Sequence, residues 1–158
     1  MLKTVTLAVT QKIQSERDFD EAMAFFKAKE FKKAFPLMKQ SAEAGNREAL
    51  LYLGLMLMRR QGVEADWAKS AKLFQMLIDS KHYDGTKISA MLSGNMGMMY
   101  GIGGYGLKRN LEQAKALLEA AVAAGDENYS EPLRMMAAKK GSFFKAEVTR
   151  PPINWNTD

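Results

Sequence analysis

The sequence contains no cysteine and only one histidine, His82. Disulfides, thiolate zinc sites and cysteine nucleophiles are therefore excluded, and a histidine-based triad or metal site has little support. We interpret His82 as an ordinary loop residue. The lack of cysteine fits a reducing compartment, and residues 1–10 show no clear cleavage site for a signal peptide. We therefore expect a cytoplasmic protein, or a periplasmic one if a leader peptide has been removed.

Long apolar runs are also missing, since no stretch approaches the roughly 18 residues that suggest a membrane span. We expect no membrane insertion. The chain has 158 residues, of which 47% are hydrophobic and 26% charged, as is ordinary for one globular domain. The formal net charge of +5 favours acidic partners. Exposed aromatic residues at stacking positions beside the basic ones are not apparent, so we expect no nucleic-acid binding. The lysines are densest between residues 27 and 39, where we interpret them as a solvated helix face.

An internal repeat is the main positive signal. Three segments, which begin at Ala34, Ser70 and Ala114, carry small and apolar residues at the offsets 0, +3, +4, +7 and +8. These offsets place the side chains on one helical stripe. The offset +11 is glycine in two copies, Gly45 and Gly125, where a left-handed residue can end a helix. The starts are 36 and then 44 residues apart, a range typical of two-helix repeats.

A second helix is predicted before two of these copies, over residues 49–57 and 92–100. Both helices contain a glycine at the same place, Gly54 and Gly97, which are 43 residues apart. A glycine inside a helix costs about 1 kcal/mol relative to alanine. We therefore infer that a neighbouring helix packs directly on the backbone at these glycines.

A glycine-containing loop follows each of these helices. The first loop contains Gly62, the second contains Gly103 and Gly106, and each ends at a residue suited to cap the next helix, Asp66 or Asn110. The second loop superficially resembles a phosphate-binding loop. A dinucleotide fingerprint, however, follows a strand and opens a helix, whereas these glycines follow a helix. We interpret them as structural and expect no cofactor.

The order of these residues resembles the Sel-one-like repeat, a member of the tetratricopeptide-like helical repeat superfamily. The resemblance covers roughly residues 20–140 and is closest at Gly97, Tyr100, Gly103, Gly106, Leu107, Asn110, Ala114 and Gly125. It is weaker one repeat earlier, where Leu57 replaces the tyrosine and Arg60 replaces the first loop glycine. The resemblance implies an all-α fold, a right-handed α-α superhelix of antiparallel helix pairs.

The predicted organisation has three parts. Residues 1–17 form an amino-terminal arm that is a short strand, an extended segment or the start of the first helix. Residues 18–140 form a solenoid of about three helix-turn-helix repeats, with helix pairs at 18–29 and 31–44, 47–59 and 67–80, and 88–100 and 111–124. A helix over 131–140 caps the stack, as repeat arrays require. Residues 141–158 form an extended carboxy-terminal tail.

The functional expectation is a protein-binding module and not an enzyme. Paired carboxylates lie at predicted helix starts, where the helix dipole explains them without catalysis. We expect Tyr52, Leu55, Asn95 and Met98 to line the concave surface and contact a partner, because they fall away from the packing stripe of their helices. The chain is expected to be a monomer, or a dimer formed through the solenoid.

Two versions of this function remain open. The first is a bacterial immunity or chaperone-like protein that binds and blocks a cognate toxin or secreted effector, as the resemblance to short Sel-one-like proteins implies. The second is a general scaffold or regulatory adaptor in signalling or in the envelope stress response. The basic charge argues against inhibition of a nuclease, because acidic inhibitors mimic nucleic acid better.

Overall fold

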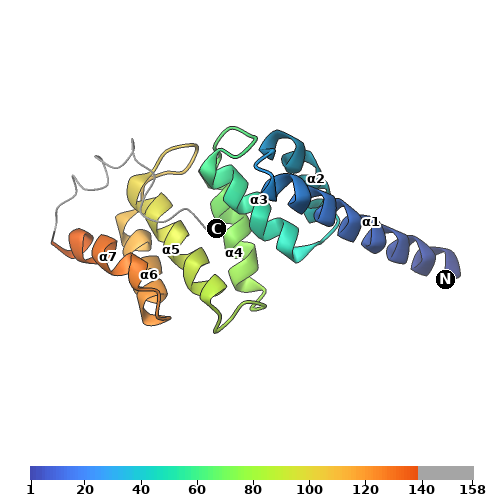
Figure 1. Cartoon of the computed structure of the whole chain (residues 1–158). Helices are drawn as coiled ribbons and strands as arrows, with labels where there is room; N and C mark the ends of the chain where they lie inside the picture. Colours follow the sequence, from blue (N-terminus) through green and yellow to red (C-terminus); the bar gives the residue numbers. More distant parts are fainter. Residues whose placement is uncertain (139–158) are drawn as a thin grey trace. The chain divides into compact units, whose positions relative to one another are not determined.

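The computed structural model describes residues 1–138, and every regular element within this range is a helix (Figure 1). The helices are α1 Leu2–Lys27, α2 Phe31–Glu43, α3 Arg47–Arg59, α4 Trp67–Asp79, α5 Lys87–Ile102, α6 Leu111–Ala123, the 3-10 helix η1 Glu127–Tyr129, and α7 Ser130–Ala137. The all-α prediction is confirmed. The tail expected over residues 141–158 lies outside the described residues.

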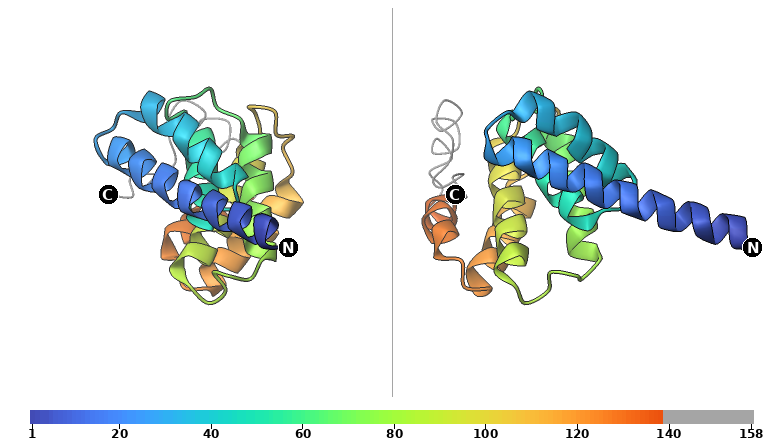
Figure 2. Two further views of the ribbon diagram at one scale, coloured as in Figure 1. Left: turned by 90° about the vertical axis from the view of Figure 1, so that its right-hand side faces the viewer. Right: turned by 45° about the vertical axis from the view of Figure 1, so that its right-hand side comes forward.

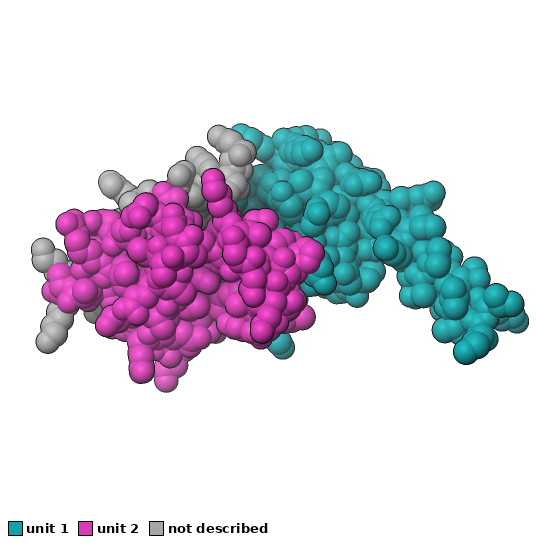
Figure 3. Space-filling model, turned by 90° about the horizontal axis from the view of Figure 1, so that it is seen from below, with its two compact units in different colours: residues 1–73 teal, residues 74–158 magenta. Residues whose placement is uncertain are grey.

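The chain divides into two compact units, residues 1–73 and residues 74–158, with the boundary inside α4 (Figure 3). In the first unit α2 packs against both α1 and α3. In the second unit α6 packs against α5 and α7. Packing between consecutive helices is what the predicted helical repeat requires, and each unit buries its own hydrophobic residues.

Three alternatives were open for residues 1–17, and the structure shows that they form the start of the first helix. α1 is a single helix of 26 residues, twice the 13 residues of α2. Its first half therefore runs past the helices of the first unit on which its second half packs (Figures 1 and 2). The threonines near its start join the helical hydrogen bonding, because the hydroxyls of Thr6 and Thr10 donate to the carbonyls four residues before them, at 2.9 and 2.8 Å.

The three copies of the repeat pattern occupy α2, α4 and α6 and bury the same positions. The residues at offsets 0, +4 and +7 are buried in every copy: Ala34, Met38 and Ser41; Ser70, Phe74 and Leu77; Ala114, Leu118 and Ala121. The residue at offset +11 has a left-handed backbone in all three, with φ of 93° at Gly45, 58° at Lys81 and 93° at Gly125. The pattern thus predicts both the buried face and the point at which each helix ends.

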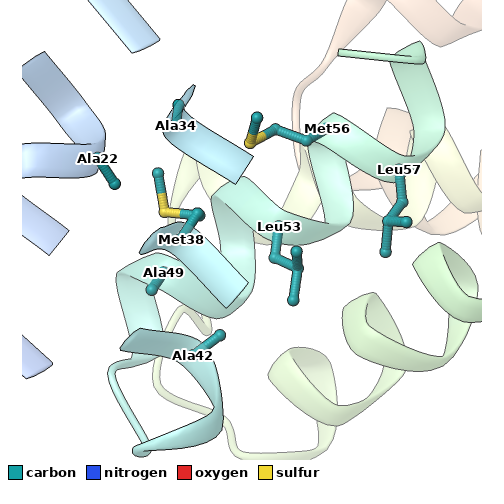
Figure 4. Packing of buried hydrophobic residues seen from close by; sticks show 8 residues of the cluster. All are labelled: Ala22, Ala34, Met38, Ala42, Ala49, Leu53, Met56 and Leu57. Carbon is teal, nitrogen blue, oxygen red and sulfur yellow. The ribbon is translucent and has the colours of Figure 1, made fainter. Parts of the chain in front are cut away.

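Small side chains let the helices of the first unit approach closely. Ala22 on α1, Ala34 on α2 and Ala49 on α3 are fully buried in one cluster (Figure 4). Met38 and Met56 are fully buried in the same cluster and fill the space that the alanines leave. Methionine suits this role because its unbranched thioether adapts to irregular gaps.

The two inter-helix loops end in the same hydrogen bonds. The backbone amide of Asp66 donates to the carbonyl of Leu57 at 3.1 Å, and that of Asn110 donates to the carbonyl of Tyr100 at 2.9 Å. Each side chain then accepts from the backbone amide three residues on, at 2.9 Å for Asp66 and 3.0 Å for Asn110. Both predicted N-caps are confirmed, and the loop of different length in each repeat returns to the same anchor.

Candidate functional site

The helix glycines lie where the next helix meets the backbone. A Cβ atom at Gly97 would lie 2.8 Å from Cγ of Leu118 and 3.1 Å from the carbonyl oxygen of Ala114, both on α6. The equivalent Gly54 offers its carbonyl to the hydroxyl of Ser70 on α4 at 2.8 Å. The inferred close approach is confirmed at Gly97. At Gly54 the side chain of Ser70 on α4 forms a hydrogen bond with the backbone of α3.

The loop glycines of the second unit build a tight turn. Gly103 ends α5 with φ of 72°, and Gly106 has φ of 84°. Gly104 and Leu107 exchange backbone hydrogen bonds of 2.8 and 3.0 Å, which close the turn around Gly106. A Cβ atom at Gly103 would also lie 2.8 Å from Cβ of Arg109. These glycines therefore serve the left-handed backbone and the close contacts of the turn itself.

Three of the four predicted partner-binding residues are buried. Leu55, Asn95 and Met98 are 3%, 7% and 4% exposed. Met98 packs with Leu118 on α6. Asn95 accepts a hydrogen bond of 2.9 Å from the hydroxyl of Tyr129. Their predicted position on an open concave surface is therefore wrong.

The fourth residue, Tyr52, is half-buried and belongs to an aromatic cluster. Its ring centroid lies 5.2 Å from that of Phe26 in an edge-on arrangement, and 6.2 Å from that of Phe19. Both phenylalanines belong to α1, whose side chains thus cover the face of α3 that was expected to be free. Apolar residues occur on every face of α3 because the helix is buried on several sides, as helices without a polar face usually are.

A basic hollow lies at the turn between α1 and α2, which prediction from the sequence missed. It is an open hollow of about 420 Å³, lined by Lys29, Glu30, Phe31, Lys32, Lys33 and Gly62. We call this site the lysine hollow. Its lining joins two segments of the first unit that are distant in sequence, the α1–α2 turn and the loop after α3.

The turn itself is set by a left-handed residue. Lys29 has φ of 60°, and its amide donates to the carbonyl of Phe26 at 2.9 Å. The next amide, of Glu30, donates to the carbonyl of Phe25 at 2.9 Å, after which α2 begins at Phe31. The ring of Phe31 packs edge-on against Phe26 with centroids 5.3 Å apart. The reversal is short, so Lys29 in the turn lies close in the chain to Lys32 and Lys33 in the first turn of α2.

Gly62 closes the other side of the hollow. It has φ of 73°, and a Cβ atom there would overlap the backbone carbonyl of Phe31. The loop after α3 therefore rests directly on the first turn of α2. Only glycine satisfies both the backbone angle and the contact without displacing the loop.

The lysine hollow carries an excess of positive charge. Lys33 pairs with Glu30, and its ammonium also lies 5.4 Å from the ring centroid of Phe25. Lys29 and Lys32 are exposed, and neither forms an ion pair with any residue in the range 1–138. Two uncompensated ammonium groups beside the half-buried ring of Phe31 suit an acidic group that is attached to an apolar one.

No protein-family model and no curated protein sequence matches the chain. Within the part of the chain that the structure describes, no three histidine, aspartate or glutamate side chains are grouped as metal ligands. No helix in that part combines the length and the apolar character that crossing a bilayer requires.

Proposed function

We propose that this chain is a non-catalytic protein-binding module of the Sel-one-like type, and that the lysine hollow receives an acidic segment of its partner. The observation that carries the proposal is the gathering of Lys29, Lys32 and Lys33 around one hollow that Phe31 also lines. The repeat pattern, which recurs in the burial of three helices, supports the family. Helical repeats of this kind present side chains on a rigid frame, which limits the entropy lost on binding.

The expected ligand is a short peptide segment with a carboxylate next to an apolar side chain. Each exposed ion pair contributes only about 0.2–1 kcal/mol, so the lysines alone give weak binding. Contact with the half-buried ring of Phe31 adds apolar burial, and the two uncompensated charges speed the encounter. Binding should therefore weaken as the salt concentration rises.

The partner that we favour is a toxin or secreted effector that this protein blocks, as an immunity or chaperone-like protein does. Support comes from the resemblance to short Sel-one-like proteins. The positive charge of the hollow is compatible with a toxin that acts on lipid, peptide or protein, because an inhibitor of a nuclease would present acidic groups. A set of several weaker partners instead of one tight partner would indicate the scaffold or adaptor alternative.

A direct test measures binding of fluorescent acidic peptides to the full chain by anisotropy. The variant Lys29→Glu/Lys32→Glu should lose about 10-fold or more in affinity, because it replaces attraction by repulsion. The matched control Lys69→Glu/Lys72→Glu changes net charge equally at exposed positions on α4 outside the hollow and should change affinity little. Equal losses in both variants would show that only net charge matters and would reject the hollow as the site.

The identity of the partner needs a separate measurement. Co-expression with the product of the adjacent gene, followed by size-exclusion chromatography, should yield a stable complex if this protein blocks a cognate toxin. The same complex should weaken with the Lys29→Glu/Lys32→Glu variant and persist with the control variant. Lack of any complex would count against the immunity function. The peptide-binding measurement would still test whether the lysine hollow binds acidic segments.

A further inference from the structure

The first half of α1 has no packing partner in its unit. Every residue from 1 to 14 is exposed, and burial begins at Ser15, whose hydroxyl lies 3.3 Å from that of Ser41 on α2. Five large aliphatic residues of this segment keep about half or more of their surface exposed, and four of them share one helix face: Leu2 85%, Val5 61%, Val9 53% and Ile13 47%. We call these four residues the arm stripe.

The arm stripe is one continuous face. At about 100° per residue its four members fall within roughly 80° of the helix circumference. The buried side of α1, marked by Ser15, Asp18 and Ala22, faces away from the stripe and continues towards the amino terminus through Gln11 and Leu7. The stripe is therefore not an extension of the face on which α2 packs. It is a separate apolar surface that α2 does not cover.

A partner would also stabilise the helical form of this segment. An isolated helix shorter than about 12–15 residues is marginal in water, and residues 1–14 extend beyond the packed part of α1. Six of these residues are β-branched, which lowers helix propensity: Thr4, Val5, Thr6, Val9, Thr10 and Ile13. A helix of this composition is expected to be stable when its apolar face is covered.

We infer that the arm stripe pairs with the arm stripe of a second copy of this chain. The same patch on both copies makes a self-complementary interface with two-fold symmetry, the commonest arrangement of homo-oligomers. Antiparallel pairing aligns the helix dipoles favourably and keeps the two folded bodies at opposite ends. A membrane surface suits the segment less well, because residues 1–14 contain only two lysines and no aromatic residue, whereas interfacial helices are rich in both.

The exposed area decides how tight the pair is. Each stripe offers on the order of 300 Å² of exposed apolar surface, from the usual area of a buried aliphatic side chain. Two stripes together bury about 600 Å², below the roughly 1,000 Å² that a stable specific interface reaches. The dimer is therefore weak and reversible, with a dissociation constant in the micromolar range or above.

The test is sedimentation equilibrium of the full chain from micromolar to millimolar concentration. The wild-type protein should pass from monomer to dimer, and Val5→Glu/Val9→Glu should raise the dissociation constant about 100-fold by placing carboxylates in the stripe. Leu7→Glu is the matched control, since Leu7 is 57% exposed but lies roughly 150° around the helix. Glutamate is at least as good a helix former as valine, so circular dichroism should show each variant folded.

Two results would overturn the inference. One is a wild-type protein that stays monomeric throughout, or a control variant that loses the dimer together with the stripe variant. The other is a monomer that instead co-sediments with vesicles of phosphatidylcholine and phosphatidylglycerol through the same valines. The cysteine-free sequence also allows a test of orientation. A mixture of Leu2→Cys and Ile13→Cys chains should form the mixed disulfide, and preferential Leu2→Cys homodimers would reject the antiparallel pair.

Discussion

Gly62 has both a left-handed backbone and a close backbone contact, and substitutions can separate the energetic costs of the two. Its backbone has φ of 73°, and a Cβ atom there would overlap the carbonyl of Phe31. Gly45 belongs to the same unit and has φ of 93°, but a Cβ atom there would meet nothing within 4 Å. Comparison of alanine at the two sites therefore isolates the cost of the contact between the loop after α3 and the start of α2.

The two costs have different sizes. A left-handed backbone costs a non-glycine residue about 1–2 kcal/mol, and part of this is offset because alanine restricts the unfolded chain. We expect Gly45→Ala to lower the free energy of unfolding by about 1 kcal/mol. Gly62→Ala adds an overlap with backbone atoms, which cannot move aside as a flexible side chain does, and overpacking typically adds about 1–3 kcal/mol. We expect a total loss of about 3 kcal/mol for Gly62→Ala.

The assay is urea unfolding followed by tryptophan fluorescence in a Trp155→Phe background. That background leaves Trp67 as the only tryptophan, and Trp67 is buried in the first unit with its indole N–H donating to the carbonyl of Met58 at 3.0 Å. The signal then reports the unit that contains both glycines. Equal losses for Gly62→Ala and Gly45→Ala would refute the contact, and with it the geometry of the lysine hollow.

Three further substitutions test the packing of the repeats, each by urea unfolding. Ser70→Ala removes a buried hydroxyl that donates to the carbonyl of Gly54. Because that carbonyl keeps its hydrogen bond within α3, we expect the free energy of unfolding to fall by only about 1 kcal/mol. Asn110→Ala removes the side-chain cap of α6 and should also lower the free energy of unfolding by about 1 kcal/mol. Glu30 occupies the N-cap position of α2 without a capping hydrogen bond, so Glu30→Ala should lower it much less. Tyr129→Phe leaves the buried amide oxygen of Asn95 without its 2.9 Å partner and should lose about 1–2 kcal/mol.

Helix boundaries were predictable because several local signals coincide in each repeat. The predicted segments 31–44, 47–59 and 111–124 match α2, α3 and α6 within one residue. In α6 the apolar stripe, the Asn110 cap and Gly125 at offset +11 all agree. Lys81 shows that the position matters more than glycine itself, because lysine adopts the same left-handed backbone at that point in the second copy.

Surfaces were less predictable because burial depends on neighbours that are distant in sequence. The predicted exposure of Leu55 assumed that one face of α3 stays open. The lysine hollow was missed for the same reason. Phe31 and Gly62 are 31 residues apart, and no local pattern indicates that their backbones touch. Helical periodicity predicts which residues share a face, but not what covers that face.

The arm stripe and the lysine hollow lie at opposite ends of α1, and this separation leads to a last prediction. From Ile13 to Lys27 the helix rises about 20 Å, so pairing of two arms leaves both hollows accessible. An antiparallel pair would hold its two hollows on the order of 60 Å apart. A ligand with two acidic segments joined by a linker of that reach should then bind the dimer more tightly than a single segment does, through a raised effective concentration.

The stripe variant separates this effect from binding at the hollow. Val5→Glu/Val9→Glu should keep the affinity for a single acidic peptide and lose the gain for the two-segment ligand. The Lys29→Glu/Lys32→Glu variant should lose both. A two-segment ligand that binds the stripe variant as tightly as the wild-type protein would mean that the hollows act singly, and that pairing through α1 does not contribute to partner binding.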